Sequence, residues 1–336
     1  MLMATYRGRL APSPTGYLHL GHARTFWVAW QRARAAHGKL IFRNEDLDYQ
    51  RCRPEFVKAM YEDLRWLGLD WDEGPDISPL SGKGGQPGDP GLSPDLGGPG
   101  DDGGSGQGGP FAPYSQSERR GFYLEAWRKL RDTGLIYPCT CSRKDLEQAL
   151  SAPHEPLRGA GVVDDLPFAA DDELPYPGTC REKIATANDY DSPAGVSWRF
   201  KVPDGETISF EDGYFGRQEF VAGRDFADFL LWRRDDIPAY QLAVVVDDSA
   251  MQITEVVRGA DLLKSTARQL LLIRALGYSV PAYFHCPLLR DEKSIRLAKR
   301  HDALSLRRLR EQGGKAEELR KRFADEVEWG KGLTSP

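Results

Sequence analysis

Two histidines near the start of the chain have a spacing that could serve a phosphate ligand. His19 and His22 are three residues apart, about one helical turn, so both side chains can reach the same ligand. They lie where a predicted strand gives way to a predicted helix, and the N–H groups at a helix N-terminus favour phosphate. Gly21, between them, allows a flat base to approach closely. A bare His-x-x-His pattern is more often a structural pair, so this site needs support from the rest of the chain.

A second group of candidate residues consists of cysteines. Zinc prefers four tetrahedral ligands, usually Cys or His. Cys139, Cys141 and Cys180 supply three, and either Tyr176 or His154 could supply the fourth. The alternative is three buried, reduced thiols. Five cysteines in 336 residues do not form a pattern typical of a disulfide framework and fit a reducing cytosol better.

The elements that would position the histidines alternate between strand and helix. The sequence predicts strands over Tyr6–Ala11 and Lys39–Arg43, and helices over Leu20–Ala36 and Pro54–Leu67. This order is typical of a parallel sheet with helical crossovers. Such sheets bind nucleotides where the first strand meets the first helix, which is where His19 lies.

The α/β pattern is interrupted and then resumes. Gly82–Pro110 contains 13 Gly and 5 Pro in 29 residues and cannot bury a core, which predicts one flexible insertion. Beyond it the sequence predicts a helix over Ser117–Arg131, a strand over Ile253–Val257, a helix over Asp261–Leu276 and a strand over Tyr283–Leu289. The segment Pro138–Pro203 is short, broken and cysteine-bearing, as expected of a small inserted module.

Composition and charge exclude several classes of protein. The sequence has no run of about 18 apolar residues and no signal-peptide pattern. We therefore expect a cytoplasmic protein that neither spans a membrane nor is exported. The net charge of −5 argues against a molecule coated in positive potential. Arg290–Arg322 nevertheless has 12 Lys and Arg against 6 Asp and Glu, which is either a local contact for phosphates or a solvated helix face.

Taken whole, the phrase from Arg9 to Thr25 resembles the opening of the glutamyl branch of the class I aminoacyl-tRNA synthetases, Arg-x-Ala-Pro-Ser-Pro-Thr-Gly-x-Leu-His-x-Gly-His-Ala-Arg-Thr. Phe42–Asp48 and Pro238–Leu262 are also similar to segments of that family. The resemblance covers Arg7 to about Arg310, apart from two inserts. It implies an α/β fold, a Rossmann-like class I aminoacyl-tRNA synthetase catalytic domain with a small inserted zinc-bearing module.

The resemblance also implies a division of the chain. We expect 1–75 to be the first half of the catalytic domain, 76–112 a Gly/Pro-rich disordered insertion, 113–137 a catalytic-domain helix, 138–225 the zinc-bearing subdomain, 226–305 the second half with a Lys-Ser-Lys-like loop, and 306–336 a basic C-terminal helical segment. The family's Cys-x-Cys followed by Tyr-x-x-x-Cys favours Tyr176 as the fourth ligand of one Zn²⁺ per chain.

Enzymes of this family join an amino acid carboxylate to the α-phosphate of ATP, used with Mg²⁺, and release pyrophosphate. Catalysis is positioning plus stabilisation of negative charge. The resemblance implies His19, His22 and Lys299 as catalytic residues, with Gly21 and Arg296 completing the ATP site. Arg296-Leu-Ala-Lys-Arg300 departs from the family's Lys-Leu-Ser-Lys-Arg, since it keeps Lys299 but loses a hydroxyl and one ammonium.

A glutamate substrate has two carboxylates and one ammonium, which suit arginine forks and a carboxylate respectively. Matching positions imply the glutamate-binding residues Arg9, Ala11, Ser13, Glu45, Tyr240 and Arg258. Arg9 and Arg258 would hold the carboxylates and Glu45 the ammonium. The sequence does not say which arginine takes the side chain.

Length distinguishes the members of the family. Full glutamyl enzymes continue into a large anticodon-binding region, whereas only 36 residues follow Arg300 here. We therefore expect the activity of a paralogue that lacks this region. Such a paralogue activates glutamate without tRNA and transfers it to queuosine in the anticodon of tRNA(Asp). We expect the protein to be a monomer. Two alternatives are a truncated enzyme that charges tRNA(Glu) and a non-catalytic tRNA-binding module.

Overall fold

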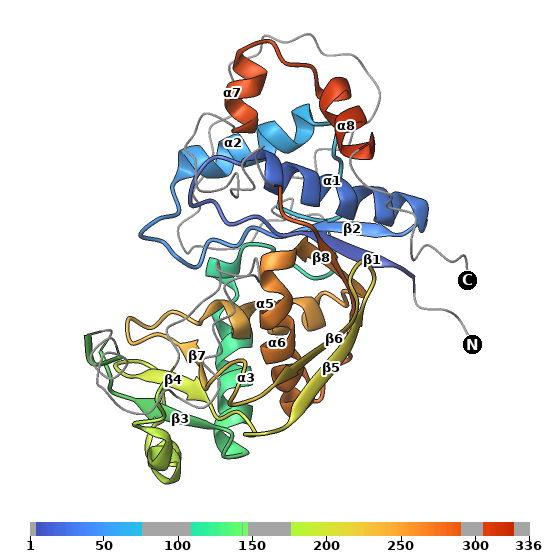
Figure 1. The fold of residues 1–336 in the computed structure, drawn as a ribbon. Helices are drawn as coiled ribbons and strands as arrows, with labels where there is room; N and C mark the ends of the chain where they lie inside the picture. Colours follow the sequence, from blue (N-terminus) through green and yellow to red (C-terminus); the bar gives the residue numbers. More distant parts are fainter. Residues whose placement is uncertain (1–4, 76–108, 143, 147–175, 290–304, 326–336) are drawn as a thin grey trace.

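The structure is a computed structural model that describes residues 5–75, 109–142, 144–146, 176–289 and 305–325. Figure 1 shows the course of the chain. The predicted insertion up to residue 108, the candidate ligand His154, and the loop with Arg296 and Lys299 lie outside the described residues.

The described elements follow the predicted order closely. The strands are β1 (Arg7–Leu10), β2 (Lys39–Phe42), β3 (Ile136–Cys139), β4 (Ser197–Phe200), β5 (Thr207–Asp212), β6 (Gly216–Val221), β7 (Phe229–Trp232), β8 (Glu255–Gly259) and β9 (Ala282–Cys286). The helices are α1 (Leu20–Ala35), α2 (Pro54–Trp66), α3 (Arg120–Asp132), α5 (Tyr240–Ala250), α6 (Leu263–Leu276), α7 (Leu306–Glu311) and α8 (Ala316–Asp325), with 3-10 turns η1 (Gln116–Glu118), η2 (Arg181–Asp189) and η3 (Ala260–Leu262).

The strands that position the candidate site run in parallel, as the alternating pattern predicts. β1 pairs with β2, and β8 pairs with β9. β1 lies beside β8, since the backbone N–H of Thr254 donates to the carbonyl of Arg7 at 2.9 Å and Arg9 reaches the carbonyl of Val257. The carboxyl ends of β1, β8 and β9 therefore meet at one edge, where ligands of open α/β sheets bind.

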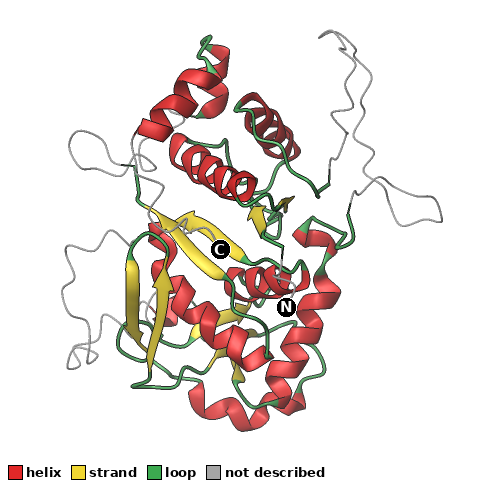
Figure 2. Ribbon diagram, turned by 90° about the vertical axis from the view of Figure 1, so that its right-hand side faces the viewer, coloured by secondary structure: helices red, strands yellow, loops and turns green. Residues whose placement is uncertain are grey.

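Helices cover the strands on two sides, as Figure 2 shows. In Figure 1, α1, α2, α7 and α8 lie on one side of β1 and β2, and α3, α5 and α6 lie on the other. Each side has its own buried apolar cluster, one around Trp27 of α1 and one around Trp127 of α3. The run Tyr240–Val246, apolar in the sequence, belongs to α5, which is buried from Gln241 to Asp248.

Two element ends have simple causes in the sequence. The predicted strand Tyr283–Leu289 ends earlier, at Cys286, because Pro287 has no N–H to donate to a sheet. The predicted stop of α6 at Gly277 is confirmed, with φ of 70° in the left-handed region. The predicted helix start at Asp261 is instead a 3-10 turn, and α6 begins at Leu263.

A separate antiparallel sheet, β3–β4–β7, lies at the lower left of Figure 1. Its strands come from both sides of the expected boundary at residue 225, since β4 pairs with β7. The β5–β6 hairpin, within the expected subdomain 138–225, instead joins the parallel strands through the bridge between Asp212 and Tyr283.

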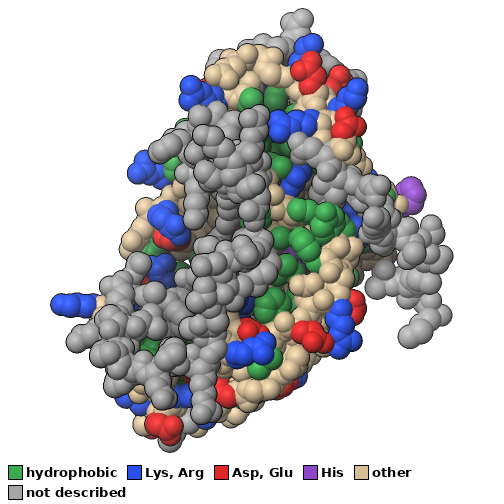
Figure 3. Space-filling model, in the orientation of Figure 1, with side chains coloured by type: hydrophobic (Ala, Val, Ile, Leu, Met, Phe, Trp, Pro, Cys, Tyr) green, Lys and Arg blue, Asp and Glu red, His purple; other side chains and the backbone are tan. Residues whose placement is uncertain are grey.

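The basic C-terminal residues lie on α7 and α8. Arg310 forms ion pairs with Glu62 at 3.0 Å and with the buried Asp63 at 3.3 Å, and Arg307 pairs with Glu311 at 2.9 Å. Figure 3 shows Lys and Arg side chains interspersed with Asp and Glu on the visible face. Within the described chain, no helix has the length and hydropathy needed to cross a bilayer.

Candidate active site

A cleft of roughly 390 Å³ opens at the carboxyl ends of β1, β8 and β9. It gathers the described residues that the sequence predicts for ATP and glutamate: Arg9, Ala11, Ser13, His19, Gly21, His22, Glu45, Tyr240 and Arg258. Leu288 and Leu289, which follow β9, also line the cleft. Residues from three distant parts of the chain therefore share one cavity.

His19 has a structural task that the sequence alone does not predict. It is the N-cap of α1, and its Nδ1 accepts hydrogen bonds from the backbone N–H of Gly21 at 3.1 Å and of His22 at 3.4 Å. Because Nδ1 accepts, the neutral ring carries its proton on Nε2. The rings of His19 and His22 stack with centroids 3.7 Å apart. The two imidazoles thus form one unit at the helix N-terminus.

Gly21 is needed for this arrangement as well as for access. A Cβ at position 21 would lie 3.0 Å from Cε1 and 3.1 Å from Nδ1 of His19. Such contacts are tighter than side chains normally tolerate, so any larger residue displaces the His19 ring.

The arginine of β1 is buried in a charge network. Arg9 donates through Nη1 to the carbonyl of Val257 at 2.8 Å, and its Nε lies 3.6 Å from Oδ1 of Asp248. Arg43 binds the same Asp248 at 2.6 Å and Glu45 at 2.9 Å. Burial raises the pKa of Glu45, although Arg43 and Arg9 oppose the shift. The charge of Arg9 is thus partly balanced within the protein.

The second arginine of the cleft, Arg258, has different partners from those of Arg9. Arg258 is 4% exposed, and its hydrogen-bond partners among the described residues are neutral: Nε donates to Nε2 of His285 at 3.2 Å and Nη2 donates to Oγ1 of Thr266 at 2.8 Å. Its Nη1 is buried and has no hydrogen-bond partner among the described residues. No carboxylate lies within ion-pair distance of it in that part of the chain. A buried, uncompensated cation in a cleft is the pattern expected of an anion-binding site.

The segment that carries Arg296 and Lys299 is bordered by described residues at the cleft. On one side Leu288 and Leu289 line the cavity. On the other side, Ser305 and His19 form an isolated antiparallel β-bridge, and the N–H of Leu306 donates to the carbonyl of Leu18 at 2.7 Å. The described residues that border this segment therefore lie at the cleft or beside it, since Leu289 lines the cavity and Ser305 pairs with His19, which also lines it.

The predicted metal ligands also come together. The Sγ atoms of Cys139, Cys141 and Cys180 all lie within 4.8 Å of one another. The hydroxyl of Tyr176 lies 3.4 Å from Sγ of Cys139 and 3.8 Å from Sγ of Cys141. It also accepts a hydrogen bond from the N–H of Cys180 at 2.7 Å. Three thiols and one phenol on one side of a small apolar cluster form a donor set that fits a tetrahedral zinc ion.

The acidity of these thiols differs. Burial opposes ionisation of Cys180, but hydrogen bonds from Thr140, Tyr176 and Cys141 outweigh it and lower the pKa of Cys180 to about 6. Burial raises the pKa of Cys141 to about 11 and also raises that of Tyr176. Ionisation of Cys180 is thus favoured without a cation, whereas Cys141 and Tyr176 become good ligands only when a metal replaces their protons.

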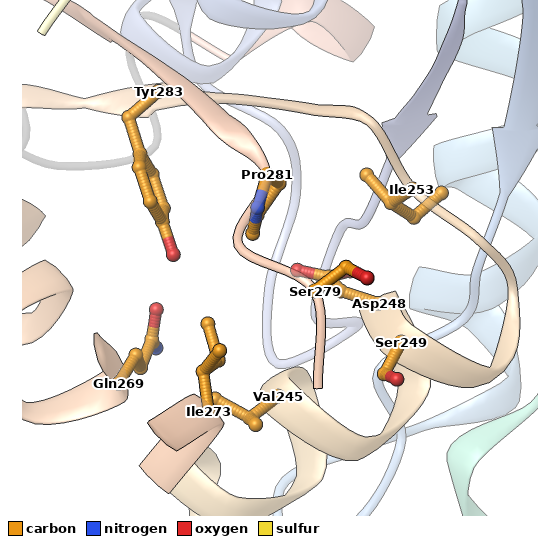
Figure 4. Close-up of a pocket in the computed structure, with 9 residues that line it drawn as sticks. All are labelled: Val245, Asp248, Ser249, Ile253, Gln269, Ile273, Ser279, Pro281 and Tyr283. Carbon is orange, nitrogen blue, oxygen red and sulfur yellow. The ribbon is translucent and has the colours of Figure 1, made fainter. Parts of the chain in front are cut away.

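A smaller cavity of about 10 Å³ is lined by residues of α5, α6 and β9 and of the loops next to them. Figure 4 shows the hydroxyl of Tyr283 and the side chain of Gln269 pointing toward one another across it. This volume holds about one water molecule at most. The cavity is therefore too small for a substrate, and the larger cleft is the candidate active site.

Some residues around the cleft are not among those that the sequence predicts for the site. His285 and Asp212 lie behind Arg258, and Asp248 lies between Arg9 and Arg43. Only an isolated histidine within an apolar strand marks His285, which is a weak signal.

The fold and this cleft define a class I synthetase catalytic domain. A family model described as tRNA synthetases class I (E and Q), catalytic domain, matches residues 5–324. A glutamate tRNA ligase of Elizabethkingia meningosepticum, solved in complex with its amino acid, is similar with a TM-score of 0.63 and 27% identity, over 85% of this chain and 50% of that one.

Sequence relatives narrow the assignment. A glutamyl-Q tRNA(Asp) synthetase of Nitratidesulfovibrio vulgaris is 45% identical over 91% of this chain and 82% of its own length. A glutamate–tRNA ligase 2 of Acidithiobacillus ferrooxidans is 39% identical over 95% of this chain and 57% of its own length. The chain belongs to the glutamyl-Q tRNA(Asp) synthetases of the class I family.

Proposed function

We propose that the protein is a ligase that activates L-glutamate with ATP, without tRNA, and transfers glutamate to queuosine in the anticodon of tRNA(Asp). The chain is more similar to the glutamyl-Q tRNA(Asp) synthetase of Nitratidesulfovibrio vulgaris than to the glutamate–tRNA ligase 2 of Acidithiobacillus ferrooxidans. This difference in identity supports transfer to queuosine over the charging of tRNA(Glu). The proposed compartment is the cytoplasm, and the proposed active form is a monomer.

One observation carries the glutamate assignment. Arg258 is buried in the cleft with neutral partners and an unpaired Nη1, so it requires an anion that the described protein does not supply. A carboxylate of the substrate meets that need with a charge-assisted hydrogen bond. Glu45, which also lines the cleft, would receive the ammonium group.

The proposed reaction has two steps. A carboxylate oxygen of glutamate attacks the α-phosphorus of ATP, the bond to the β-phosphate oxygen breaks, and pyrophosphate leaves. A hydroxyl of the queuosine cyclopentenediol then attacks the acyl carbon, and AMP leaves with the electron pair of the broken bond. His19 and His22 would bind the phosphates beside Gly21, at the N-terminus of α1. Arg296 and Lys299 would complete this grip, and Mg²⁺ would accompany ATP.

We also propose that Cys139, Cys141, Cys180 and Tyr176 hold one zinc ion. The proximity of the four donors supports this, with Tyr176 favoured over His154 because its hydroxyl lies between the thiols. Bound zinc would supply structural cross-linking between β3 and the turn before η2. The chain's own residues orient the donors, since the N–H of Cys180 fixes the hydroxyl of Tyr176.

The proposed division of the chain keeps the boundaries expected from the sequence, although β4 pairs with β7 across residue 225 and the β5–β6 hairpin joins the parallel strands. The expected halves 1–75 and 226–305 both contribute residues to the cleft, which supports one catalytic domain. Residues 76–112 would be an insertion, 113–137 a catalytic-domain helix, 138–225 the zinc-bearing subdomain and 306–336 a basic segment that meets tRNA.

The test is glutamate-dependent exchange of pyrophosphate into ATP, followed by transfer of labelled glutamate to tRNA(Asp) with or without queuosine. We expect exchange without tRNA and labelling only of the queuosine-containing tRNA. Equal labelling of both forms, or labelling of the 3′ end of tRNA(Glu), would overturn the assignment. Absence of exchange would favour a non-catalytic binding module.

A further inference from the structure

Behind Arg258 lies a buried chain of polar groups. Nδ1 of His285 lies 2.6 Å from Oδ2 of Asp212, and Nε2 of His285 faces Nε of Arg258 at 3.2 Å. His285 is fully buried and Asp212 is 4% exposed. Asp212 ends β5, His285 belongs to β9 and Arg258 belongs to β8, so three neighbouring strands each contribute one member.

The direction of each hydrogen bond follows from chemistry. A carboxylate accepts and a guanidinium donates, so the neutral His285 ring must carry its proton on Nδ1 and accept at Nε2. Burial, together with the nearby Arg258 and Arg9, lowers the pKa of His285 to about 4, which keeps the ring neutral at pH 7. An imidazolium would have no lone pair to offer Arg258.

Asp212 is itself held firmly. Its Oδ1 accepts from the backbone N–H of Tyr214 at 3.0 Å and of Phe215 at 2.9 Å, and its Oδ2 accepts from the N–H of His285 at 3.1 Å. Burial opposes ionisation of Asp212, but the bonds from His285 and from the turn outweigh it and hold the pKa of Asp212 below its usual value. Asp212 therefore stays ionised and fixes the His285 ring.

These bonds select which edge of Arg258 can meet a ligand. Nε and Nη2 form one edge of the guanidinium, and they are taken by His285 and Thr266. The end formed by Nη1 and the second hydrogen of Nη2 remains for a carboxylate, in the forked geometry that arginine offers such groups. The ring of Tyr283, 5.6 Å from the guanidinium carbon, covers another side.

We propose that His285, held by Asp212, is a positioning residue that fixes the guanidinium of Arg258 toward the carboxylate of the amino acid substrate. This inference rests on the proposed function, because it assumes that the anion in the cleft is glutamate. It assigns to His285 no contact with substrate. Through Arg258, His285 affects the affinity for the amino acid and not the affinity for ATP.

Two substitutions at one position separate the two bonds of the ring. His285→Gln places an acceptor near the position of Nε2 and gives up the bond to Asp212. His285→Asn places a donor near the position of Nδ1 and leaves Nε of Arg258 without its acceptor. It also removes the contact of Nε2 with Oγ1 of Thr266 at 3.1 Å, while the bond from Nη2 of Arg258 to Thr266 can remain. Asp212→Asn is a third variant, in case a buried amide at position 285 impairs folding. Thermal unfolding of each variant establishes that it is folded.

The assay is pyrophosphate exchange at varied glutamate and varied ATP with the full chain. We expect His285→Asn to raise the KM for glutamate about tenfold or more, the loss of one hydrogen bond to a charged group, with the KM for ATP unchanged within about twofold. His285→Gln should stay close to the wild-type KM for glutamate. Asp212→Asn should raise the KM for glutamate alone, because the Asn amide can donate to Nδ1 of His285 and shift the ring proton to Nε2, where it faces the Nε–H of Arg258.

An unchanged KM for glutamate in folded His285→Asn would overturn the inference. Parallel rises in the KM for glutamate and the KM for ATP, in His285→Asn and His285→Gln alike, would indicate a purely structural role and would also overturn it. Absence of glutamate-dependent exchange in the wild-type protein would overturn the proposed function, and this inference with it. The two failures are thus distinguished by the wild-type measurement.

Discussion

The capping bond of His19 allows its structural and catalytic contributions to be measured separately. His19→Ala removes the acceptor for the N–H groups of Gly21 and His22, which is worth about 1 kcal/mol for a helix N-cap. For a chain of 336 residues, with an unfolding entropy of about 2.1 cal/mol/K per residue, that corresponds to a fall in Tm of about 1.5 °C. The same change removes the Nε2–H group proposed to bind a phosphate, worth about 1.5–3 kcal/mol, or roughly 10- to 150-fold in exchange rate.

His19→Asn is the matched control, because Asn caps helices well but has no group at the position of Nε2. We expect His19→Asn to recover most of the lost Tm and little of the lost exchange activity. The measurements are thermal unfolding and pyrophosphate exchange at saturating glutamate. Wild-type exchange in His19→Asn would refute the phosphate contact, and an unchanged Tm in His19→Ala would refute the capping role.

Three further expectations concern other parts of the molecule. Cys180→Ser should lower bound zinc from about one per chain, measured by metal analysis, and wild-type protein purified without zinc would end the ligand proposal. Burial raises the pKa of Asp63 to about 6, so its contribution to stability is present at low pH and lost as pH rises through 6. Denaturant titrations should show a loss of about 1 kcal/mol between pH 5 and 7.5 that is absent from Asp63→Asn. Arg308→Glu should weaken tRNA binding and make that binding less dependent on salt. Arg310→Glu should also lower Tm, because it removes the ion pairs with Glu62 and Asp63. Unchanged tRNA binding by Arg308→Glu would count against a tRNA contact on α7.

The sequence predicts the local elements well because their signals are local. Proline and glycine mark the ends of β1, α6 and β9, and the alternation of strand and helix predicts the parallel pairs. The role of His285 is different, because it depends on distant partners that the local pattern does not reveal. Asp212 and His285 are 73 residues apart and meet only because β5 bridges to β9.

The cleft residues were predicted together through their resemblance to a family, and not from their individual properties. An arginine such as Arg258 looks like any surface charge in a sequence. Its burial, its neutral partners and its unpaired Nη1 are properties of the packed strands, and they distinguish it from Arg9, which has Asp248 nearby.

The contact between β1 and β8 also has a consequence for how the protein is made. Arg9 and Val257 are 248 residues apart, so the cleft depends on contacts of very high sequence separation. Such contacts form slowly, because a long loop must close before they can stabilise the fold. A growing chain on the ribosome thus lacks the proposed amino acid site until β8 and β9 have emerged, and we expect that the partly made protein cannot bind its substrate early.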